Sequence, residues 1–476
     1  MGKFHIFAHR KKSQNLLTLL KSISGIRGTI GGLPGDTLSP IDVVKYSAAY
    51  GHWLRTTCDK PLVIIGRDAR PSGSTISALV CATLQAQGIS VIDLGLSTTP
   101  TVEMAVTAEH AQGGIIITAS HNPAGWNALK LLNEKGEFIS EEDGRTILAF
   151  ADSGDVVFAE VKKFGSYTSN DTYIDWHIDR ILEHPLVDVE AIRAKKFKVI
   201  VDAVNSTGGI AVPRLLKKLE VDVTELHCEP NGLFPHNPEP VPENITQICG
   251  ELESGQFDLG IVVDPDVDRL VLVCEDGQPF GEEYTLVAVS DYVLGKRPGN
   301  TVSNLSSTRA LRDITEKHGG VYHAAAVGEV NVVTKMKEVN AVIGGEGNGG
   351  VILPDLHFGR DALAGIALFL SSLAENGKSV SMLRSRFPNY HISKNKIELT
   401  PDIDVDMILE ELKLKYFKNP INTADGVKIE FETEWVHLRK SNTEPIIRIY
   451  AESESQVTAE HLANKLISDI KEIIAD

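Results

Sequence analysis

The feature that most constrains the fold is an alternation of short apolar runs with helix-length segments. PLVIIGRDAR and GGIIITASHNP are runs rich in β-branched residues that end in polar residues, and the segment from Ser72 to Gly88 has the length of a helix. This alternation is typical of α/β layers and argues against a sandwich or a helical bundle. We therefore expect mixed sheets covered by helices.

The same pattern restarts twice before the chain changes character. KFKVIVDAVNSTGG begins a second unit and NTVSNLSST a third, whereas beyond about Pro388 alternating strands precede one amphipathic closing helix, typical of an α+β domain. A chain of 476 residues is also too long for one hydrophobic core. We predict an N-terminal extension at 1–21, domain I at 22–165, domain II at 170–280, domain III at 281–388 and domain IV at 389–476.

Charge and composition exclude several classes of protein. A formal net charge of -17 argues against a nucleic-acid partner, but a few arginines in a cleft can still bind a small anion. No apolar run is long enough to span a membrane. The five cysteines are scattered, which favours reduced thiols and a cytoplasmic protein. The basic segment Met1 to Lys21 lacks a secretory apolar core and is interpreted as an extension, with a transit peptide as the alternative.

The first candidate site is TASHNP, residues 118–123, at the end of a buried run. Open α/β sheets bind ligands at the carboxyl ends of their strands, which is where these polar residues fall. Ser120 is therefore well placed to act as a nucleophile or a phosphate carrier. The alternative is a polar turn that caps the next element.

The second candidate site is DPDVDR, which carries Asp264, Asp266 and Asp268 between the apolar runs LGIVV and LVLV. In an extended segment, carboxylates at i, i+2 and i+4 project to the same side and repel one another unless a cation lies among them. Hard oxygen ligands suit Mg²⁺. A solvated acidic turn is the alternative, and the spacing does not fit an EF-hand.

Two further loops can contact a sugar phosphate. GGEGNGG at 344–350 allows close backbone approach to a ligand, and Glu346 and Asn348 offer an acceptor and an amide to sugar hydroxyls. RKSNTEP at 439–445, with Arg448, combines guanidinium groups, hydroxyls and backbone N–H groups into a cradle for a phosphate dianion. A plain turn and a surface hairpin are the respective alternatives.

Together these four motifs resemble the α-D-phosphohexomutase superfamily of phosphoglucomutases, phosphomannomutases and phosphoglucosamine mutases. TASHNP, DPDVDR and RKSNTEP carry the resemblance, with SGIRG near the start and VGE at 327–329 as further family positions. It runs from about Ile23 to the C-terminal helix and implies a heart-shaped molecule of four domains around a central cleft. Family members commonly have a serine and a histidine in this loop, where the present chain has Asn348 and Gly350. This GEGNGG version is similar to the loop of the archaeal-type phosphoglucosamine mutases.

The resemblance also implies roles for individual residues. Ser120 would carry the phosphate, and Mg²⁺ would bind Asp264, Asp266 and Asp268 together with an oxygen of the serine phosphate. The residues that would line the reaction centre are Arg27, His121, Lys130 and Arg269. The residues that would bind the substrate are Glu346 and Asn348 at the sugar, and Arg439, Ser441, Asn442, Thr443 and Arg448 at its distal phosphate.

The implied function is that of an isomerase, a phosphoglucosamine mutase that interconverts glucosamine-6-phosphate and glucosamine-1-phosphate and feeds UDP-N-acetylglucosamine synthesis. It would work through a 1,6-bisphosphate, with glucosamine- or glucose-1,6-bisphosphate as activator, as a monomer or homodimer. The alternatives are a mutase for mannose or glucose phosphates and a non-catalytic sugar-phosphate sensor. A serine hydrolase is disfavoured because the GxSxG motif is missing. The mutase hypothesis requires Ser120 and the aspartates to share one cavity.

Overall fold

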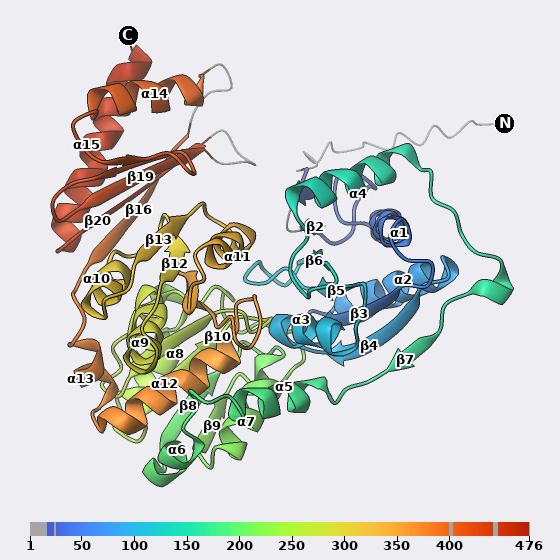
Figure 1. Cartoon of the computed structure of the whole chain (residues 1–476), viewed down its shortest axis with the longest axis horizontal. Coiled ribbons are helices and arrows are strands. Elements are labelled where there is room, and N and C mark those ends of the chain that lie inside the picture. Colours follow the sequence, from blue (N-terminus) through green and yellow to red (C-terminus); the bar gives the residue numbers. More distant parts are fainter. Residues whose placement is uncertain (1–16, 23–24, 399–402, 441–445, 476) are drawn as a thin grey trace, which may run out of the picture.

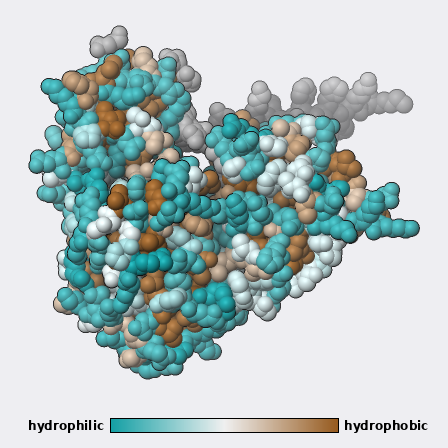
Figure 2. Space-filling model, viewed as in Figure 1, coloured by the Kyte–Doolittle hydropathy of each residue, from teal (hydrophilic) through white to brown (hydrophobic). Residues whose placement is uncertain are grey.

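Four sheets follow one another along the chain in the computed structural model, which describes residues 17–22, 25–398, 403–440 and 446–475 (Figure 1). The blue first sheet and the red last sheet lie at the two ends of an arc, with the green and yellow sheets between them. Three mixed α/β sheets and one antiparallel sheet confirm the expected fold class. Hydrophilic side chains cover most of the face seen in Figure 2. Among the described helices, none combines the length and the apolar character needed to cross a bilayer.

The first sheet has parallel strands at its centre and antiparallel strands toward one edge. Helices α1, α2 and α4 pack on one face and α3 on the other. Helix α1 begins at a capping box formed by Ser39 and Asp42, which satisfies backbone N–H groups at the helix start. The strands, in sheet order, are β1 (Leu20–Ser22), β2 (Gly25–Thr29), β6 (Trp126–Leu132), β5 (Gly113–Ile117), β3 (Leu62–Arg67), β4 (Ser90–Leu96) and β7 (Tyr167–Ser169). The helices are α1 (Pro40–Arg55), α2 (Gly73–Ala86), α3 (Thr99–Ala108) and α4 (Glu141–Ser153), and the 3₁₀ turn η1 (Val161–Lys163) precedes β7.

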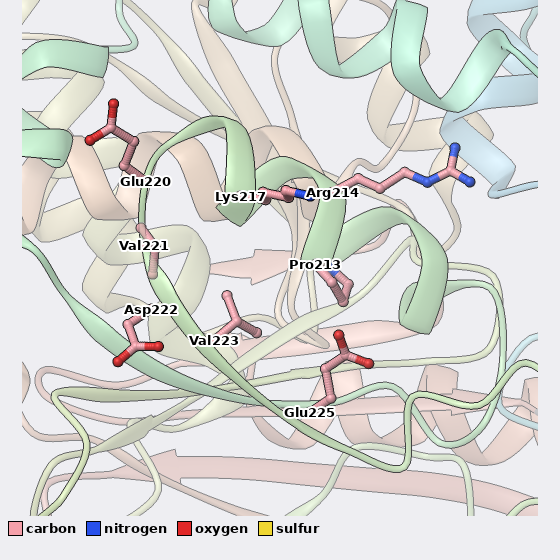
Figure 3. A pocket seen from close by; sticks show the side chains of 8 residues that line it. All are labelled: Pro213, Arg214, Lys217, Glu220, Val221, Asp222, Val223 and Glu225. Carbon is pink, nitrogen blue, oxygen red and sulfur yellow. The ribbon is translucent and has the colours of Figure 1, made fainter.

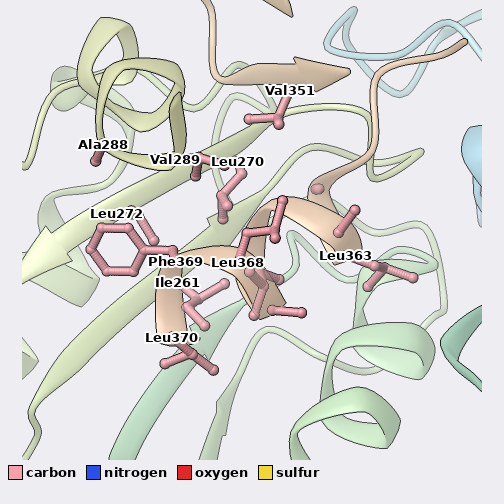
Figure 4. Close-up of a cluster of buried hydrophobic side chains, with 14 of the residues drawn as sticks. Ile261, Leu270, Leu272, Ala288, Val289, Val351, Leu363, Leu368, Phe369 and Leu370 are labelled. Atoms are coloured by element: carbon pink, nitrogen blue, oxygen red, sulfur yellow. The ribbon is translucent and has the colours of Figure 1, made fainter. Parts of the chain in front are cut away.

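The second and third sheets share one hydrophobic core through helix α12 (Ala362–Asn376). Figure 4 shows Phe369 and Leu368 of this helix beside Ile261 and Leu272 of the second sheet, with Val351 of the third sheet nearby. Almost every side chain in α12 is buried, as expected of a helix that is apolar all round. The two sheets therefore form one continuous body around this helix.

Both sheets combine parallel strands with one antiparallel edge strand. The second sheet runs β11 (Leu270–Cys274), β10 (Leu259–Val263), β8 (Lys198–Asp202), β9 (Asp222–Leu226), with α5 (Tyr173–Leu182), α6 (Val189–Lys195), α7 (Gly208–Lys218), η2 (Pro242–Asn244) and α8 (Thr246–Leu252). The third runs β13 (Tyr322–Ala325), β12 (Thr301–Asn304), β14 (Ile343–Glu346), β15 (Gly350–Ile352), with α9 (Glu282–Lys296), α10 (Ala310–Lys317), α11 (Glu329–Glu338) and α13 (Val380–Arg384).

The last sheet is antiparallel throughout and has two helices on one face. Its strands, in sheet order, are β16 (His391–Glu398), β20 (Ile446–Ser453), β19 (Trp435–Lys440), β18 (Val427–Glu430) and β17 (Ile421–Asn422), and its helices are α14 (Val405–Lys415) and α15 (Gln456–Ala475). The other face contacts the third sheet's loops, where Lys428 Nζ donates to the carbonyl oxygen of Leu305 over 2.9 Å. This contact anchors the last sheet beside the third.

Candidate active site

Ser120 lies in a turn directly after β5. Its backbone φ is 48°, a value that residues other than glycine rarely adopt. The guanidinium of Arg70, which is 1 % exposed, holds this turn. Its Nε donates to Asp68 Oδ2 over 2.9 Å, and its terminal nitrogens donate to the carbonyl oxygens of Ser120, Asn122, Pro123 and Trp126. Sequence analysis missed Arg70, although the polar end of GRDAR was a signal for it.

The aspartate motif forms a compact turn, so the expected extended segment is wrong. Val267 has a φ of 64°, and Asp264 Oδ1 accepts from the backbone N–H groups of Asp268 and Arg269 over 3.1 and 3.2 Å. The turn, rather than strand alternation, brings the three carboxylates together. Each offers an oxygen within 4.8 Å of the others'.

The starts of helices α3 and α12 hold the aspartate turn in place. Thr99, at the start of α3, donates its backbone N–H to the Asp266 carbonyl over 2.9 Å and its hydroxyl to Asp266 Oδ2 over 2.6 Å. From the third sheet's side, the N–H of Ala362 donates to the Val267 carbonyl over 3.2 Å. Thr99 gave no signal in the sequence, because its role depends on a contact with a residue 167 positions away.

Ser120 and the aspartate turn meet at one point. The Ser120 hydroxyl donates to Asp264 Oδ2 over 2.7 Å, and Lys130 Nζ lies 2.7 Å from Asp266 Oδ2 and 3.4 Å from Asp268 Oδ2. Ser120 and Lys130 line a small hollow together with Arg27. Ser120 and the aspartate turn are therefore in direct contact, although the three aspartates are not among the residues that line this hollow.

The carboxylates fit a divalent metal ion. Asp266 Oδ1 and Asp268 Oδ1 are buried and, within the described part of the chain, have no hydrogen-bond partner. Burial raises the pKa of Asp264 well above its ordinary value, and the charges of Asp268 and Asp266 raise it further. A cation bound by all three would offset both the burial and the repulsion, so this donor set suits a hard metal ion.

The remaining predicted reaction-centre residues surround the serine. His121 Nδ1 lies 3.4 Å from Ser120 Oγ, and burial, followed by the charge of Arg269, lowers the pKa of His121 to about 2. Arg27 lies on β2, with Nη1 3.4 Å from Asn122 Oδ1. For Lys130, burial lowers the pKa, but the carboxylates of Asp266 and Asp268 outweigh burial, so the pKa is raised and the side chain is an ammonium at neutral pH.

Arg360 joins the aspartate turn to the sugar loop, a role that sequence analysis missed. Its guanidinium is nearly buried and contacts three carboxylates, Asp268 and Glu329 over 2.7 Å and Glu346 over 2.9 Å. These acids come from the aspartate turn, the VGE segment and the GEGNGG loop. Because one rigid group holds all three, a shift of one loop moves the others.

Glu346 is held in place by protein groups. Besides Arg360, its carboxylate accepts from Asn304 Nδ2 over 2.9 Å and from the Gly328 N–H over 3.2 Å. Asn348 Oδ1 accepts from the Gly350 N–H over 3.3 Å. The sugar loop is thus built on a fixed carboxylate.

The loop's glycines are explained by protein contacts rather than by room for a ligand. A Cβ at Gly345, Gly347 or Gly349 would lie 2.0 Å from the Gly350 carbonyl oxygen, 1.9 Å from Glu283 Oε2 and 2.4 Å from the Leu270 carbonyl oxygen, respectively. Gly345 and Gly349 also have φ angles of 155° and 87°. The glycines are needed for the loop to pack.

Two of the predicted phosphate-binding residues face each other in the last sheet. Arg439 on β19 is directly opposite Arg448 on β20, and Lys396 on β16 is opposite Arg448 on its other side. Like charges directly opposite are unfavourable in a sheet unless an anion lies near them. Arg439, Arg448 and Lys396 together form a cationic row across the sheet. Lys396 was not predicted, because its place in the row depends on strand pairing. Ser441, Asn442 and Thr443 lie outside the described residues.

A chain of contacts links this cationic row to the sugar loop. Arg439 Nε lies 3.4 Å from Asp425 Oδ2, which also accepts from the Val327 N–H over 3.1 Å. The next N–H along the chain, that of Gly328, donates to Glu346. These contacts connect the last sheet to the loop that carries Glu346.

Another surface hollow lies on α7 and β9 (Figure 3). Its lining mixes charges of both signs, with Arg214 and Lys217 on α7 and Glu225 on β9. It includes none of the predicted site residues. The chemistry is concentrated at Ser120 and the aspartate turn.

Comparisons with known proteins identify the family of the chain. Residues 19–156, 175–277 and 281–390 match the phosphoglucomutase/phosphomannomutase alpha/beta/alpha domains I, II and III, and residues 395–468 match the C-terminal domain of the same family. The chain is 32% identical to a probable phosphoglucosamine mutase of Methanopyrus kandleri, over 95% of this chain and 98% of that one. It is 35% identical to a phosphoglucomutase/phosphomannomutase of Thermococcus kodakarensis, over 91% and 95%.

A solved structure shows the same architecture. The crystal structure of a phosphoglucomutase/phosphomannomutase family protein from Burkholderia thailandensis matches with a TM-score of 0.83 at 26% identity, over 96% of this chain and 97% of that one. All four domains and their order are thus accounted for by one family. The chain belongs to the α-D-phosphohexomutase superfamily and is a phosphoglucosamine mutase-like isomerase that transfers a phosphoryl group.

Proposed function

We propose that this enzyme interconverts glucosamine-6-phosphate and glucosamine-1-phosphate, with Ser120 as the phosphate carrier and a 1,6-bisphosphate as the intermediate. The observation that carries the proposal is the contact of the Ser120 hydroxyl with Asp264 within a group of three buried aspartates. Phosphoryl transfer depends on in-line positioning and on neutralising negative charge, and the charged groups around Ser120 suit both.

The metal ion proposed is Mg²⁺, held by Asp264, Asp266, Asp268 and an oxygen of the serine phosphate. When bound, it supplies positive charge to the oxygens of the transferring phosphoryl group. Oxygen-only donors support Mg²⁺ over a softer metal. Thr99 and Lys130 keep Asp266 oriented by their contacts with its Oδ2 atom.

The protein's own groups would orient the reactants and move the proton. Arg269, next to Asp268, and Arg27, in the hollow, would bind oxygens of the transferring phosphate. His121 and Lys130 are the candidates for proton transfer to and from the sugar hydroxyl, because one lies beside Ser120 Oγ and the other lines the same hollow. The contact with Asp264 would orient the Ser120 hydroxyl so that it can accept the phosphate again at the end of the reaction.

The distal phosphate of the sugar would bind between Arg439 and Arg448, with Ser441, Asn442 and Thr443 completing the cradle. The sugar ring would lie between this cradle and Ser120, against Glu346 and Asn348. A 1,6-bisphosphate must present each phosphate in turn, so the cradle must accept either orientation. Guanidinium groups on a sheet that closes over the ligand suit this requirement.

Glucosamine phosphates are favoured by the GEGNGG loop and by the name of the Methanopyrus kandleri relative. The alternative, glucose or mannose phosphates on the same machinery, is favoured by the name of the Thermococcus kodakarensis relative. A glucosamine- or glucose-1,6-bisphosphate would serve as activator.

We further propose the domain limits 22–165, 170–280, 281–388 and 389–476 and a monomeric or homodimeric state. We also propose that the enzyme works in the reducing cytoplasm, which suits five unpaired cysteines.

Substrate preference is tested by comparing kcat/KM for glucosamine-6-phosphate, glucose-6-phosphate and mannose-6-phosphate, each with Mg²⁺ and a 1,6-bisphosphate. We expect the highest value for glucosamine-6-phosphate. A higher value for either neutral sugar would assign the enzyme to the alternative. Failure of all three, in a protein that binds sugar phosphate, would instead favour the sensor.

A further inference from the structure

A second group of side chains that could bind a metal lies beside the residues that hold the aspartate turn. His177 is on α5, His357 and Asp361 lie just before α12, and Glu103 is on α3. His177, Asp361 and Glu103 have side chains at most 1% exposed, and that of His357 is 11% exposed. The proposed reaction uses none of them, so this cluster needs its own explanation.

Both imidazole rings present the same nitrogen to the same oxygen. His177 Nε2 lies 2.9 Å from Asp361 Oδ2, and His357 Nε2 lies 3.3 Å from it. With bonds of about 2.1 Å to an ion, separations of 2.9 and 3.3 Å correspond to angles of roughly 90° and 105° at that ion. The three atoms, mutually within 4.8 Å, therefore suit a single metal ion.

The other polar atom of each ligand is held by the protein. His177 Nδ1 lies 3.0 Å from Thr101 Oγ1, and His357 Nδ1 lies 3.3 Å from Glu103 Oε2. Asp361 Oδ1 accepts from the backbone N–H groups of Leu363 and Ala364, in the first turn of α12, over 2.9 and 3.1 Å. Histidines that bind metals are normally oriented in this way, by a partner on the ring nitrogen that does not face the ion.

Glu103 is an independent sign that a positive charge belongs here. Its carboxyl is buried and, among the described residues, neither oxygen has a hydrogen-bond partner; its one polar contact is the ion-pair approach to His357. A buried carboxylate with so little compensation is costly unless a cation lies near it.

We propose that His177 Nε2, His357 Nε2 and Asp361 Oδ2 bind a transition-metal dication such as Zn²⁺, with Glu103 and Thr101 orienting the two rings. Imidazole nitrogens select such ions over Mg²⁺, which prefers oxygen. This site is distinct from the aspartate turn and does not depend on the substrate.

The position of the site indicates a structural role. Thr101 is two residues after Thr99, which contacts Asp266, and Asp361 directly follows Arg360, which contacts Asp268. An ion bound by α5 and the start of α12, with α3 supporting both rings, ties together the elements that hold the aspartate turn. The ion therefore stabilises the aspartate turn through α3, α5 and α12, without contacting the substrate.

The test uses the metal-stripped full-length enzyme with excess Mg²⁺ to occupy the aspartate turn, and Co²⁺ as the probe. We expect one Co²⁺ per chain, with visible absorption typical of nitrogen ligands, and displacement of Co²⁺ by Zn²⁺. Zn²⁺ should also raise the Tm in the presence of excess Mg²⁺. Absence of bound Co²⁺ and of any Zn²⁺-dependent change in Tm would overturn the proposal and leave the cluster as direct ion pairs.

Variants assign the ligands. His177→Gln and His357→Gln should lose the Co²⁺ absorption, and Glu103→Gln should weaken Co²⁺ binding about 10- to 100-fold through its effect on ring orientation. His184→Gln is the matched control, since this histidine follows α5 but lies outside the cluster, 3.9 Å from Asp355. Unchanged absorption in both ligand variants would assign Co²⁺ elsewhere and contradict the proposal. Should those variants not fold, the stoichiometry and the Tm of the unmodified chain decide the question.

Discussion

The hydroxyl of Ser120 lies 2.7 Å from Asp264 Oδ2, although the two residues are 144 positions apart in the chain. One follows β5 in the first sheet and the other follows β10 in the second. The contact brings the proposed phosphate carrier to the proposed metal ligands. Five predictions follow from this arrangement and its surroundings, and each has its own measurement.

Replacement of the carrier should abolish turnover and preserve the fold. Ser120→Ala removes the hydroxyl and keeps the Cβ, so the strained backbone of the turn is unchanged and Arg70 still holds it. We expect kcat to fall by several orders of magnitude, with an unchanged Tm and no phosphate on the protein by intact mass. Ser90→Ala, at a half-buried serine of the same sheet that contacts Ser166, should retain full activity. Near-normal turnover of Ser120→Ala would exclude the carrier role.

Loss of one aspartate oxygen should weaken metal binding. Asp266→Asn replaces a metal-binding carboxylate by an amide, so half-maximal activation should need a higher Mg²⁺ concentration than in the unmodified enzyme. Titration of Mg²⁺ into EDTA-treated enzyme measures the change. Asp276→Asn, at an exposed acid in the turn after β11, is the control. An EDTA response identical in both variants would argue against the aspartate turn as the metal site.

Arg360 should act as a positioning residue. Arg360→Lys leaves a single ammonium to serve three separately directed carboxylates, an arrangement that lysine geometry cannot reproduce. We expect a higher KM for sugar phosphate together with a higher Mg²⁺ requirement, because both loops lose a common support. Arg386→Lys, at an exposed arginine, should change neither. A fall in kcat alone, with KM and the Mg²⁺ requirement unchanged, would contradict the positioning role.

The cationic row should determine affinity for the distal phosphate. Arg448→Ala and Arg439→Ala each remove a charge-assisted contact of about 1.5–3 kcal/mol, which corresponds to a KM increase of roughly 10- to 150-fold. The stability of the free protein should change little, because the arginines face each other. Lys440→Ala, next to Arg439 but paired with Asp406, is the matched control. Equal KM values in all three variants would contradict a distal phosphate site here.

Lys428 should impose a pH dependence on stability. Burial lowers the pKa of Lys428 to about 8 in the folded protein, whereas an unfolded lysine titrates near about 10.4. Between these values the unfolded chain binds more protons, so this group makes stability rise with pH across that window and contributes no slope below it. The Tm of the unmodified enzyme relative to Lys428→Met should therefore increase between about pH 8 and pH 10. A flat difference across that window would contradict the assignment.

Sequence reasoning identified residues whose chemistry is local. Ser120 and the three aspartates stand at the ends of apolar runs, where periodicity alone places them at the edge of a sheet. Arg439 and Arg448 were recognised by the density of anion-binding groups around them. What failed was local geometry, since the aspartates lie in a turn with Val267 at positive φ and not in an extended segment.

The amino-acid sequence by itself determined the order of strands and helices, the polar residues that end the strands, and hence the family and the type of chemistry. Only the tertiary structure decided which distant residues support that chemistry: Arg70 beneath the serine, Thr99 against Asp266, and Arg360 among three acids. The physical reason is that periodicity and side-chain chemistry act over a few residues, whereas these contacts join residues that are far apart in the sequence and meet only in the folded chain.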